Sequence, residues 1–514
     1  MKSGKWEPGT EFPIPAQGRA AGVLLPLSSL PSPWGIGSFG AAAREWVGLL
    51  AEAGQKYWQI LPLGPTGWGD SPYQSFSAFA LSPYYIDLDA LCGAGLLRED
   101  EFAGIPWGAS PGQADYGALY RRRPEVLRRA FSRFRPCAAF DAFRKEAKFW
   151  LDDYCLFQAL KDAAGGASWL DWEGPLRFRE KAALEKAARE LSGETAYHAF
   201  VQYQAYSQWR ELKACANRAG VAIIGDMPIY VALDSADTWS RSALFQLGED
   251  RRPLRAAGCP PDPFAAKGQF WGNPLYRWDY IAETGFDWWL ERLRSGLSLF
   301  DVVRIDHFRG FESYFSIPAE AACAPGGPDA SGGEWVKGPG LAFIAAIREA
   351  LPGAAIIAED LGYLTAGVRD LLAASGCPGM KVLQFAFDSR EAADYMPYTY
   401  RRNCAAYTGT HDNPTSAGWF KTARQEDAAL ALDYFGLDDP GEIHWAFIRA
   451  ALSSVAGLAV IPAQDYLGLG NEARINTPST TGGGNWRWRL NGDNIAAFDS
   501  LAPRVRRLAL INGR

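Results

Sequence analysis

Four acidic residues stand at or directly after short apolar runs, in the strings IIGDMPIYV, VVRIDHFRG, IIAEDLG and YTGTHDNP. They are Asp226, Asp306, Glu359 and Asp412. One such residue is expected wherever a strand leaves the core for water, but four at the same end of parallel strands would converge on one opening. Paired carboxyl groups in different surroundings suit glycosidic bonds, because one attacks as a carboxylate while the other donates a proton to the leaving oxygen.

Asp306 is the candidate for the ionised, attacking group. Arg304 stands two residues earlier, so both side chains lie on the same face of an extended strand. The arginine charge favours the ionised form of the carboxylate; a purely structural ion pair is the alternative. Glu359 is the candidate proton donor, because its neighbours are apolar except for Asp360 and burial raises the pKa of a carboxyl group.

Other catalytic chemistries have weaker support. The four histidines, His198, His307, His411 and His444, form neither HxH nor HExxH, so no zinc site is predicted. The chain has no EF-hand pattern, although an all-oxygen calcium site stays open. It has no GxSxG, the usual context of a nucleophilic serine, and its 8 cysteines form no CxxC.

The elements that must position these residues are short apolar runs separated by helical patterns such as 38–54, 196–219 and 285–299. Continuous apolar runs are typical of parallel strands buried on both faces. The runs are Gly22–Leu27, Tyr57–Pro62, Val221–Asp226, Asp301–Asp306, Ala354–Glu359, Lys381–Phe387, Cys404–Thr408 and Leu458–Pro462. Strand and helix alternating in this way predict an α/β protein with a (β/α)₈ barrel. A doubly wound sheet is the alternative, but no GxGxxG follows the first run.

The barrel is expected to carry insertions. Residues 1–86 form its first part, 87–195 a mainly helical insertion, and 196–514 the remainder. Elaborated loops are expected at about 227–280, 310–340 and 465–490, on the face where barrel enzymes keep their sites. No low-complexity linker divides the chain, so one interwoven unit is predicted, without a C-terminal β-sandwich domain.

Composition and charge argue against some classes of binding partner. The 514 residues carry a net charge of −6, so there is no basic footprint for nucleic acid. The sequence has no run of 18 apolar residues, so no membrane span is predicted, and the N-terminus lacks an apolar leader. Together with scattered single cysteines, this predicts a cytoplasmic protein. Oligomeric state is not predicted.

Aromatic residues make up 13% of the chain, including 20 tryptophans. They indicate either a large core or a surface that stacks on sugar rings. GDSPYQSFSAFA places Ser71 and Tyr73 just after the second run, and KGQFWGNPLYRW places Trp271 in a glycine-rich loop after the third. Stacking on glucosyl rings accounts for a tryptophan in such a loop.

The motifs together resemble the 4-α-glucanotransferases of the amylomaltase, or disproportionating-enzyme, family, which belongs to the α-amylase superfamily. The matching strings appear in family order from residue 22 to about residue 490 and include LPLSSLPSPWGIGSFG, ILPLGPTGWGDSPYQSFSAFA, IIGDMPIYVALDSADTW, PPDPFAAKGQFWGNPLYRW, VVRIDHFRGFESYF, IAEDLG, YTGTHDN and DYLGLGNEARINTP. The set is specific, whereas any one string alone would be a weaker signal.

The resemblance implies a role for each matching residue. Asp306 matches the nucleophile, Glu359 the general acid/base, and Asp412 the third carboxylate, which holds and distorts the reacting glucose. The residues implied in substrate binding are Ser71, Tyr73, Asp226, Gln269, Trp271, Arg304, His411 and Asn476. Family members work without a nucleotide or metal cofactor. The implied substrates are α-1,4-glucans and maltooligosaccharides, with glucose as an acceptor.

Three positions depart from the family pattern. Pro263 stands where many bacterial members have tyrosine in a loop that covers the glucan, with Phe264 as the candidate substitute. Trp68 stands where some members carry tyrosine at a secondary glucan contact, and Ser479 stands in a segment where glycine is common. Subsite preferences are therefore not carried over.

Two other functions remain as alternatives. An α-amylase-type hydrolase uses the same residues but usually carries a C-terminal β-sandwich, and only about 25 residues follow NWRWR here. A non-catalytic glucan-binding protein has no need of three carboxylates. The sequence therefore favours a retaining transferase that passes a glucan segment to another 4-hydroxyl.

Overall fold

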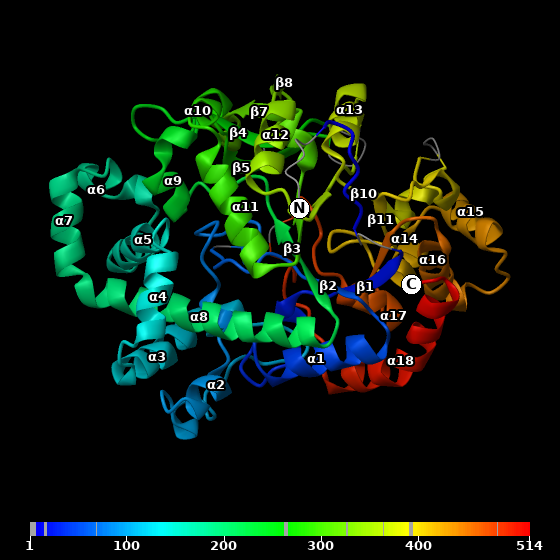
Figure 1. Ribbon diagram of the computed structural model, residues 1–514, viewed down its shortest axis with the longest axis horizontal. Helices are drawn as coiled ribbons and strands as arrows, with labels where there is room; N and C mark the ends of the chain where they lie inside the picture. Colours follow the sequence, from blue (N-terminus) through cyan, green and yellow to red (C-terminus); the bar gives the residue numbers. More distant parts are fainter. Residues whose placement is uncertain are drawn as a thin grey trace.

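Eight parallel strands form the centre of the molecule (Figure 1). The computed structural model describes residues 7–14, 18–67, 69–261, 266–324, 327–362, 364–389, 394–480 and 482–514. The strands follow one another around the sheet in the order β10-β11-β12-β1-β2-β3-β6-β9. Their bounds are β1 (Ala20–Leu24), β2 (Tyr57–Gln59), β3 (Ala222–Met227), β6 (Val302–Ile305), β9 (Ile356–Ala358), β10 (Gly379–Val382), β11 (Cys404–Tyr407) and β12 (Leu458–Pro462).

The sheet closes where its first and last strands meet. The Ala358 N–H at the end of β9 donates to the Pro378 carbonyl, just before β10, at 2.9 Å. Closure leaves no open edge in this sheet and brings all eight carboxyl ends to one mouth. The predicted (β/α)₈ barrel of the α/β class is therefore confirmed.

One predicted strand is shorter than expected. The run 381–387 continues the strand only to Val382, and Leu383–Phe387 is a 3-10 helix. Leu383 and Phe387 both pack into a separate apolar cluster with Met396 and Phe447. The 3-10 turn keeps these two residues, four positions apart, within about 8 Å of each other along its axis, whereas an extended strand would separate them by about 13 Å.

Helices cover the outside of the barrel. They include α1 (Ala41–Glu52), α8 (Ser192–Arg218), α11 (Asp287–Leu299), α12 (Gly340–Ala350), α13 (Ala366–Ser375), α16 (Ile443–Ser453) and α18 (Gly492–Ile511). The last helix, α18, lies beside the first, α1 (Figure 1), and the Trp46 and Phe498 rings meet there at 4.6 Å. No strand follows β12 among the residues that the structure describes.

The segment between β2 and β3 holds the helical insertion. It contains α2 (Leu88–Gly93), α3 (Tyr116–Arg133), α4 (Ala138–Glu146), α5 (Leu151–Ala163), α6 (Gly174–Arg177) and α7 (Lys181–Glu190). The long helix α8 then runs from Ser192 back to the barrel, so it crosses residue 195. The division of the chain at residues 86 and 195 stays a prediction.

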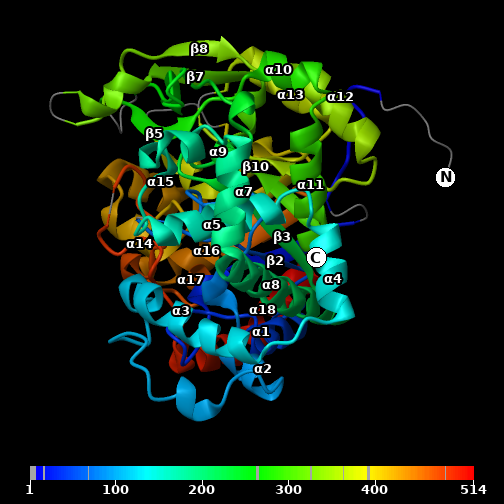
Figure 2. The ribbon, with the colours of Figure 1, turned by 90° about the vertical axis from the view of Figure 1, so that its left-hand side faces the viewer.

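A second sheet, which the sequence analysis did not anticipate, lies over one side of the barrel (Figure 2). Its four antiparallel strands run in the order β5-β4-β7-β8, with bounds β4 (Arg255–Cys259), β5 (Gln269–Pro274), β7 (Ser313–Pro318) and β8 (Glu334–Lys337). These strands come from the two segments expected to be elaborated loops. Gly258 allows the close approach at the centre, because a Cβ there would lie 2.0 Å from the Gln269 carbonyl oxygen.

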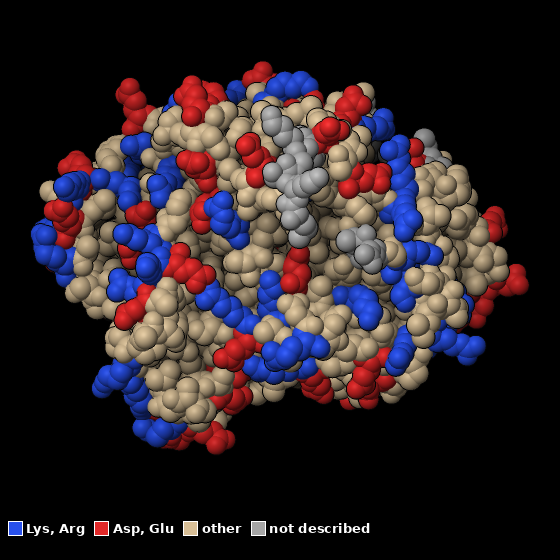
Figure 3. All heavy atoms as spheres, in the orientation of Figure 1, with Lys and Arg blue, Asp and Glu red and all other residues tan. Residues whose placement is uncertain are grey.

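Much of the aromatic content belongs to the core. Six of the tryptophans that the structure describes are fully buried: Trp46, Trp58, Trp169, Trp209, Trp239 and Trp289. On the face that Figure 3 shows, acidic and basic side chains are interspersed. None of the described helices is both long and apolar enough to cross a membrane.

Candidate active site

A buried ion pair between two neighbouring strands lies at the base of the site. Asp226 on β3 and Arg304 on β6 are register partners. The Arg304 Nη1 lies 2.7 Å from both carboxylate oxygens of Asp226. The Tyr73 hydroxyl donates to Asp226 Oδ2 at 2.7 Å. Because both charges are removed from water, each depends on the other for compensation.

Asp306 shares the same arginine. It follows β6, and its N–H donates to the Met227 carbonyl at 2.9 Å, which fixes its backbone. Its Oδ1 lies 3.0 Å from Arg304 Nη1, so a single nitrogen bridges Asp226 and Asp306. Burial lowers the pKa of Arg304, but the two carboxylates outweigh it and hold that pKa well above its ordinary value. Burial raises the pKa of Asp306, and Arg304 opposes this rise.

Glu359 lies beside Asp306 because of an unusual backbone turn. His307, directly after Asp306, has φ +52°, a left-handed conformation that is uncommon for a residue with a side chain. Its N–H donates to Glu359 Oε2 at 2.7 Å, and the Leu361 N–H donates to Oε1 at 2.6 Å. Burial raises the pKa of Glu359, while Arg304 and the two N–H donors lower it. The peptide that follows Asp306 therefore holds the second carboxyl group in place.

The third carboxylate, Asp412, belongs to a separate hydrogen-bonded group. Its Oδ1 accepts a hydrogen bond from Asn476 Nδ2 at 2.6 Å and lies 3.3 Å from His411 Nε2. The buried His411 ring stacks on Tyr73 with centroids 5.1 Å apart. Burial lowers the pKa of His411, which favours a neutral imidazole. Since Tyr73 also bonds Asp226, it connects this group to the Arg304 group.

The second sheet contributes a polar and an aromatic side chain. The Trp271 indole N–H donates to Gln269 Oε1 at 3.0 Å, and its ring meets His307 edge-on at 4.9 Å. Ser71 contacts the backbone of its own turn, because its Oγ accepts a hydrogen bond from the Tyr73 N–H at 3.3 Å. Of the residues predicted for the site, ten form one connected group, and Ser71 shapes the turn that carries Tyr73. The predicted roles of these residues stay predictions.

Of the four residues noted for family departures, only Ser479 belongs to the described part of the chain. Trp68, Pro263 and Phe264 lie outside the described residues. Ser479 is exposed with φ +61°, a conformation that glycine adopts at little cost. This gives a physical reason for glycine in that segment.

Two features of the site were missed from the sequence. His307 acts through its backbone N–H and its left-handed turn, which no composition signal reports. Trp486 lies in the string NWRWR, and its ring packs 5.9 Å from His411 and 5.8 Å from Tyr73. An aromatic residue beside glycines in a mouth loop was the only signal that could have found it.

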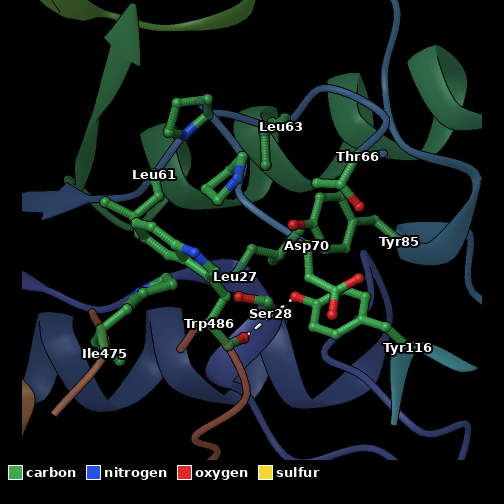
Figure 4. A pocket seen from close by; sticks show the side chains of 13 residues that line it. Leu27, Ser28, Leu61, Leu63, Thr66, Asp70, Tyr85, Tyr116, Ile475 and Trp486 are labelled. Carbon is green, nitrogen blue, oxygen red and sulfur yellow. Dashed lines mark hydrogen bonds between the residues drawn. The ribbon is translucent and has the colours of Figure 1, made fainter. Parts of the chain in front are cut away.

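A small pocket adjoins Trp486 (Figure 4). The Trp486 indole and the Tyr116 phenol lie on its wall, and the Tyr116 hydroxyl donates to the Trp486 carbonyl at 3.1 Å. Asp70 and Ser28 supply further polar groups. The pocket therefore continues the site on the side of β1 and β2, away from the carboxyl pair.

Among the described residues, one group of side chains has the spacing of a metal site. It comprises Asp162, Glu194 and His198 in and beside the helical insertion. Arg128 donates two hydrogen bonds to Glu194, at 3.1 and 2.7 Å. The Arg128 guanidinium therefore already compensates the charge of Glu194, as a metal ion would.

Acidic groups held in different surroundings at the carboxyl mouth of a (β/α)₈ barrel define an enzyme suited to glycosidic bonds. A family model described as 4-alpha-glucanotransferase matches residues 25–495. The 4-alpha-glucanotransferase of Clostridium butyricum is 46% identical over 492 residues, which cover 95% of this chain and 99% of that protein. That of Thermus thermophilus is 48% identical over 485 residues, 92% of this chain and 95% of the relative.

Structural comparison agrees. The amylomaltase from Streptococcus agalactiae, solved in complex with acarbose, has a TM-score of 0.92 and 39% identity, covering 96% of this chain and 99% of that one. The chain therefore belongs to the 4-alpha-glucanotransferase family. The resemblance predicted from the motifs is confirmed.

Proposed function

We propose that this 4-alpha-glucanotransferase is a retaining enzyme that acts through a covalent glucosyl-enzyme. It transfers a segment of an α-1,4-glucan to the 4-hydroxyl of glucose or of another glucan. The observation that carries the proposal is the connected pair of carboxyl groups. Asp306 contacts Arg304, and the next peptide N–H, that of His307, binds Glu359.

In the first half-reaction, an Asp306 oxygen forms a bond to the anomeric carbon as the bond from that carbon to the glycosidic oxygen breaks. Glu359 gives its proton to that oxygen, so the leaving segment departs as a neutral alcohol. In the second, Glu359 takes the proton of the acceptor hydroxyl, whose oxygen attacks the anomeric carbon and releases Asp306. The number of glycosidic bonds is unchanged.

The protonation states follow from the surroundings of the two groups. Burial raises the pKa of Asp306 above its ordinary value, and the Arg304 guanidinium nitrogen, 3.0 Å away, opposes that rise and favours the carboxylate. Glu359 is buried and bonds no cation within hydrogen-bond distance among the described residues, so burial favours the proton there. Its two N–H contacts oppose that effect and fix the plane of the carboxyl group.

The remaining residues position sugar rings. Asp412, with Asn476 and His411, holds and distorts the glucose at the point of cleavage. Asp226, whose side chain is fully buried, supports the site through its contacts with Arg304 and Tyr73. Tyr73, Trp271 and Gln269 bind neighbouring glucosyl units. Preorganised positioning can contribute up to about 7–11 kcal/mol to a reaction between bound groups. This supports transfer over hydrolysis, because water is abundant but not positioned.

Pure maltotriose tests the proposal. It should yield glucose and a ladder of longer maltooligosaccharides, with little net gain in reducing ends. A hydrolase would raise reducing ends in step with glucose and form no product longer than the donor. A glucan-binding protein without catalysis would leave maltotriose intact.

A further inference from the structure

Exposed tyrosines lie on the segments that follow β10 and β11. Tyr398, in a short turn over Pro397–Thr399, has 74% of its surface exposed. Tyr434, in α15 (Gln425–Phe435), has 40% exposed. Tyr434 packs on Phe387 and Tyr395 packs on Phe385, and these two phenylalanines lie two positions apart in the 3-10 turn Leu383–Phe387. We name Tyr395, Tyr398 and Tyr434 the tyrosine platform.

The platform is held from below. The Tyr434 ring packs on Phe387 at 5.7 Å and on Phe435 at 5.3 Å, at the edge of the apolar cluster beside β10. Lys381 Nζ lies 4.9 Å from the Tyr395 ring centroid and donates to the Asp394 carbonyl at 3.3 Å. Rings supported in this way lose little freedom when a ligand binds.

The platform lies at the same end of the barrel as the mouth, because the 3-10 turn Leu383–Phe387 directly follows the carboxyl end of β10. Tyr395 meets the exposed Phe385 ring edge-on at 5.3 Å. The neighbour of Phe385, Gln384, is buried and donates through Nε2 to the Pro414 carbonyl at 2.9 Å. Pro414 stands two residues after Asp412, so this hydrogen bond ties the turn that carries Phe385 to the loop that carries the third carboxylate.

The tyrosine platform has side chains that suit a sugar chain. A phenol offers a flat apolar face and a hydroxyl that can donate or accept a hydrogen bond. Where Figure 1 draws α15, the surface is largely uncharged, with acidic side chains at its outer edge (Figure 3). Exposed aromatic patches of this kind mark binding surfaces.

We propose that the tyrosine platform binds the outer part of α-1,4-glucans that are too long for the catalytic subsites. This inference rests on the proposed function, because the glucan must extend from the mouth. A second attachment point makes binding at the mouth intramolecular for long chains. Short oligosaccharides, which end before the platform, gain nothing from it.

The test compares Tyr398→Ala/Tyr434→Ala with Tyr120→Ala. Tyr120, on α3 of the helical insertion, is 67% exposed and so controls for loss of an exposed phenol. In the platform variant, KM for amylose should rise roughly threefold to tenfold with kcat unchanged, while kcat/KM on maltotriose stays within about twofold. The control should match the wild type on both substrates, and Tyr398→Phe/Tyr434→Phe should retain most amylose affinity because it keeps the rings.

Binding is measured separately from turnover by retardation in gels that contain glycogen. Weaker retardation of the platform variant alone supports the proposal, and this readout holds even if the maltotriose test contradicts the proposed function. Unchanged amylose KM and retardation would overturn the inference, as would equal losses on maltotriose and amylose. It is also wrong if the wild type forms dimers that the platform variant cannot, with no change in glucan affinity.

Discussion

The barrel mouth and the helical insertion each gather an arginine, a histidine and acidic side chains, but in different surroundings. In the mouth, Arg304 and Asp226 keep only 4% and 0% of their side chains exposed. In the insertion, Arg128 and Glu194 keep 42% and 38% exposed at the same contact distance of 2.7 Å. The same residue types thus form an interdependent buried group in one place and a solvated ion pair in the other.

The difference in burial explains why the charged groups of the mouth have shifted pKa values suited to catalysis. In the mouth, removal of water raises the pKa of carboxyl groups and makes one cation compensate two anions. In the insertion, water screens the same interactions. Variants in matched pairs should therefore separate the two regions clearly.

The largest contrast is expected in turnover. Asp306→Asn and Glu359→Gln should each lower kcat by roughly 10⁴-fold or more, because nucleophile and proton donor act in the bond-breaking step. Asp162→Asn, the matched change in the insertion, should leave kcat unaltered. Disproportionation of maltotriose measures all three. Retained activity in Asp306→Asn would remove that residue from the nucleophile role.

Loss of the central cation should have the next largest effect. Arg304→Met leaves Asp226 and Asp306 facing each other in a buried site, so the free energy of unfolding should fall by about 3–5 kcal/mol. Arg128→Met should change it by no more than about 1 kcal/mol. Urea unfolding at pH 7 gives both values. Similar losses in the two variants would contradict the contrast between regions.

The buried carboxyl group of Asp237, in α9 (Ala236–Ser240), should respond to pH. Burial raises the pKa of Asp237 to about 6, while its Oδ2 accepts the Ala78 N–H at 2.7 Å. Since the folded pKa exceeds the unfolded one, the stability that Asp237 contributes is full below about pH 4 and is lost as pH rises through 6. Asp237→Asn should remove this loss, worth roughly 2–3 kcal/mol by pH 8.

Unfolding measured at pH 5 and pH 8 tests this. The gain of Asp237→Asn over the wild type should be larger at pH 8 than at pH 5. Asp162→Asn, exposed in the insertion, should show no such trend. A gain that shrinks with rising pH would show that the sign is wrong.

The smallest effect concerns the backbone of the mouth. Ser479→Gly should raise the free energy of unfolding by at most about 1 kcal/mol, because glycine adopts φ +61° without strain. Gly482→Ala, at φ +79°, is the reciprocal control and should lower it. Thermal unfolding of both variants gives the comparison. A stability loss in Ser479→Gly would mean that the side chain has a contact that outweighs the strain.

The parts that the sequence predicted share a local signal. Each barrel strand is a buried apolar run, and the two-residue spacing of Arg304 and Asp306 places them on one face whatever the rest of the chain does. The family motifs then named the site residues. Local sequence pattern was therefore enough to predict the barrel strands and the contact between Arg304 and Asp306.

The parts that were missed depend on distant segments or on backbone geometry. Asp226 and Arg304 are 78 residues apart and meet only because β3 and β6 are neighbours. The left-handed turn at His307 has no signature in residue type. The antiparallel sheet was missed in part because two of its strands, β4 and β5, contain Gly258 and Gly272, and glycine is typical of loops.

The central claim is that Asp306 carries the glucosyl group and Glu359 handles the proton. It is tested most directly with Glu359→Gln and an α-maltotriosyl fluoride, whose leaving group needs no proton. The glycosylated enzyme should accumulate, and peptide mass spectrometry should find the added maltotriosyl mass on Asp306. Asp306→Asn should show no such adduct. Fluoride release without an adduct, or an adduct on another residue, would contradict the account.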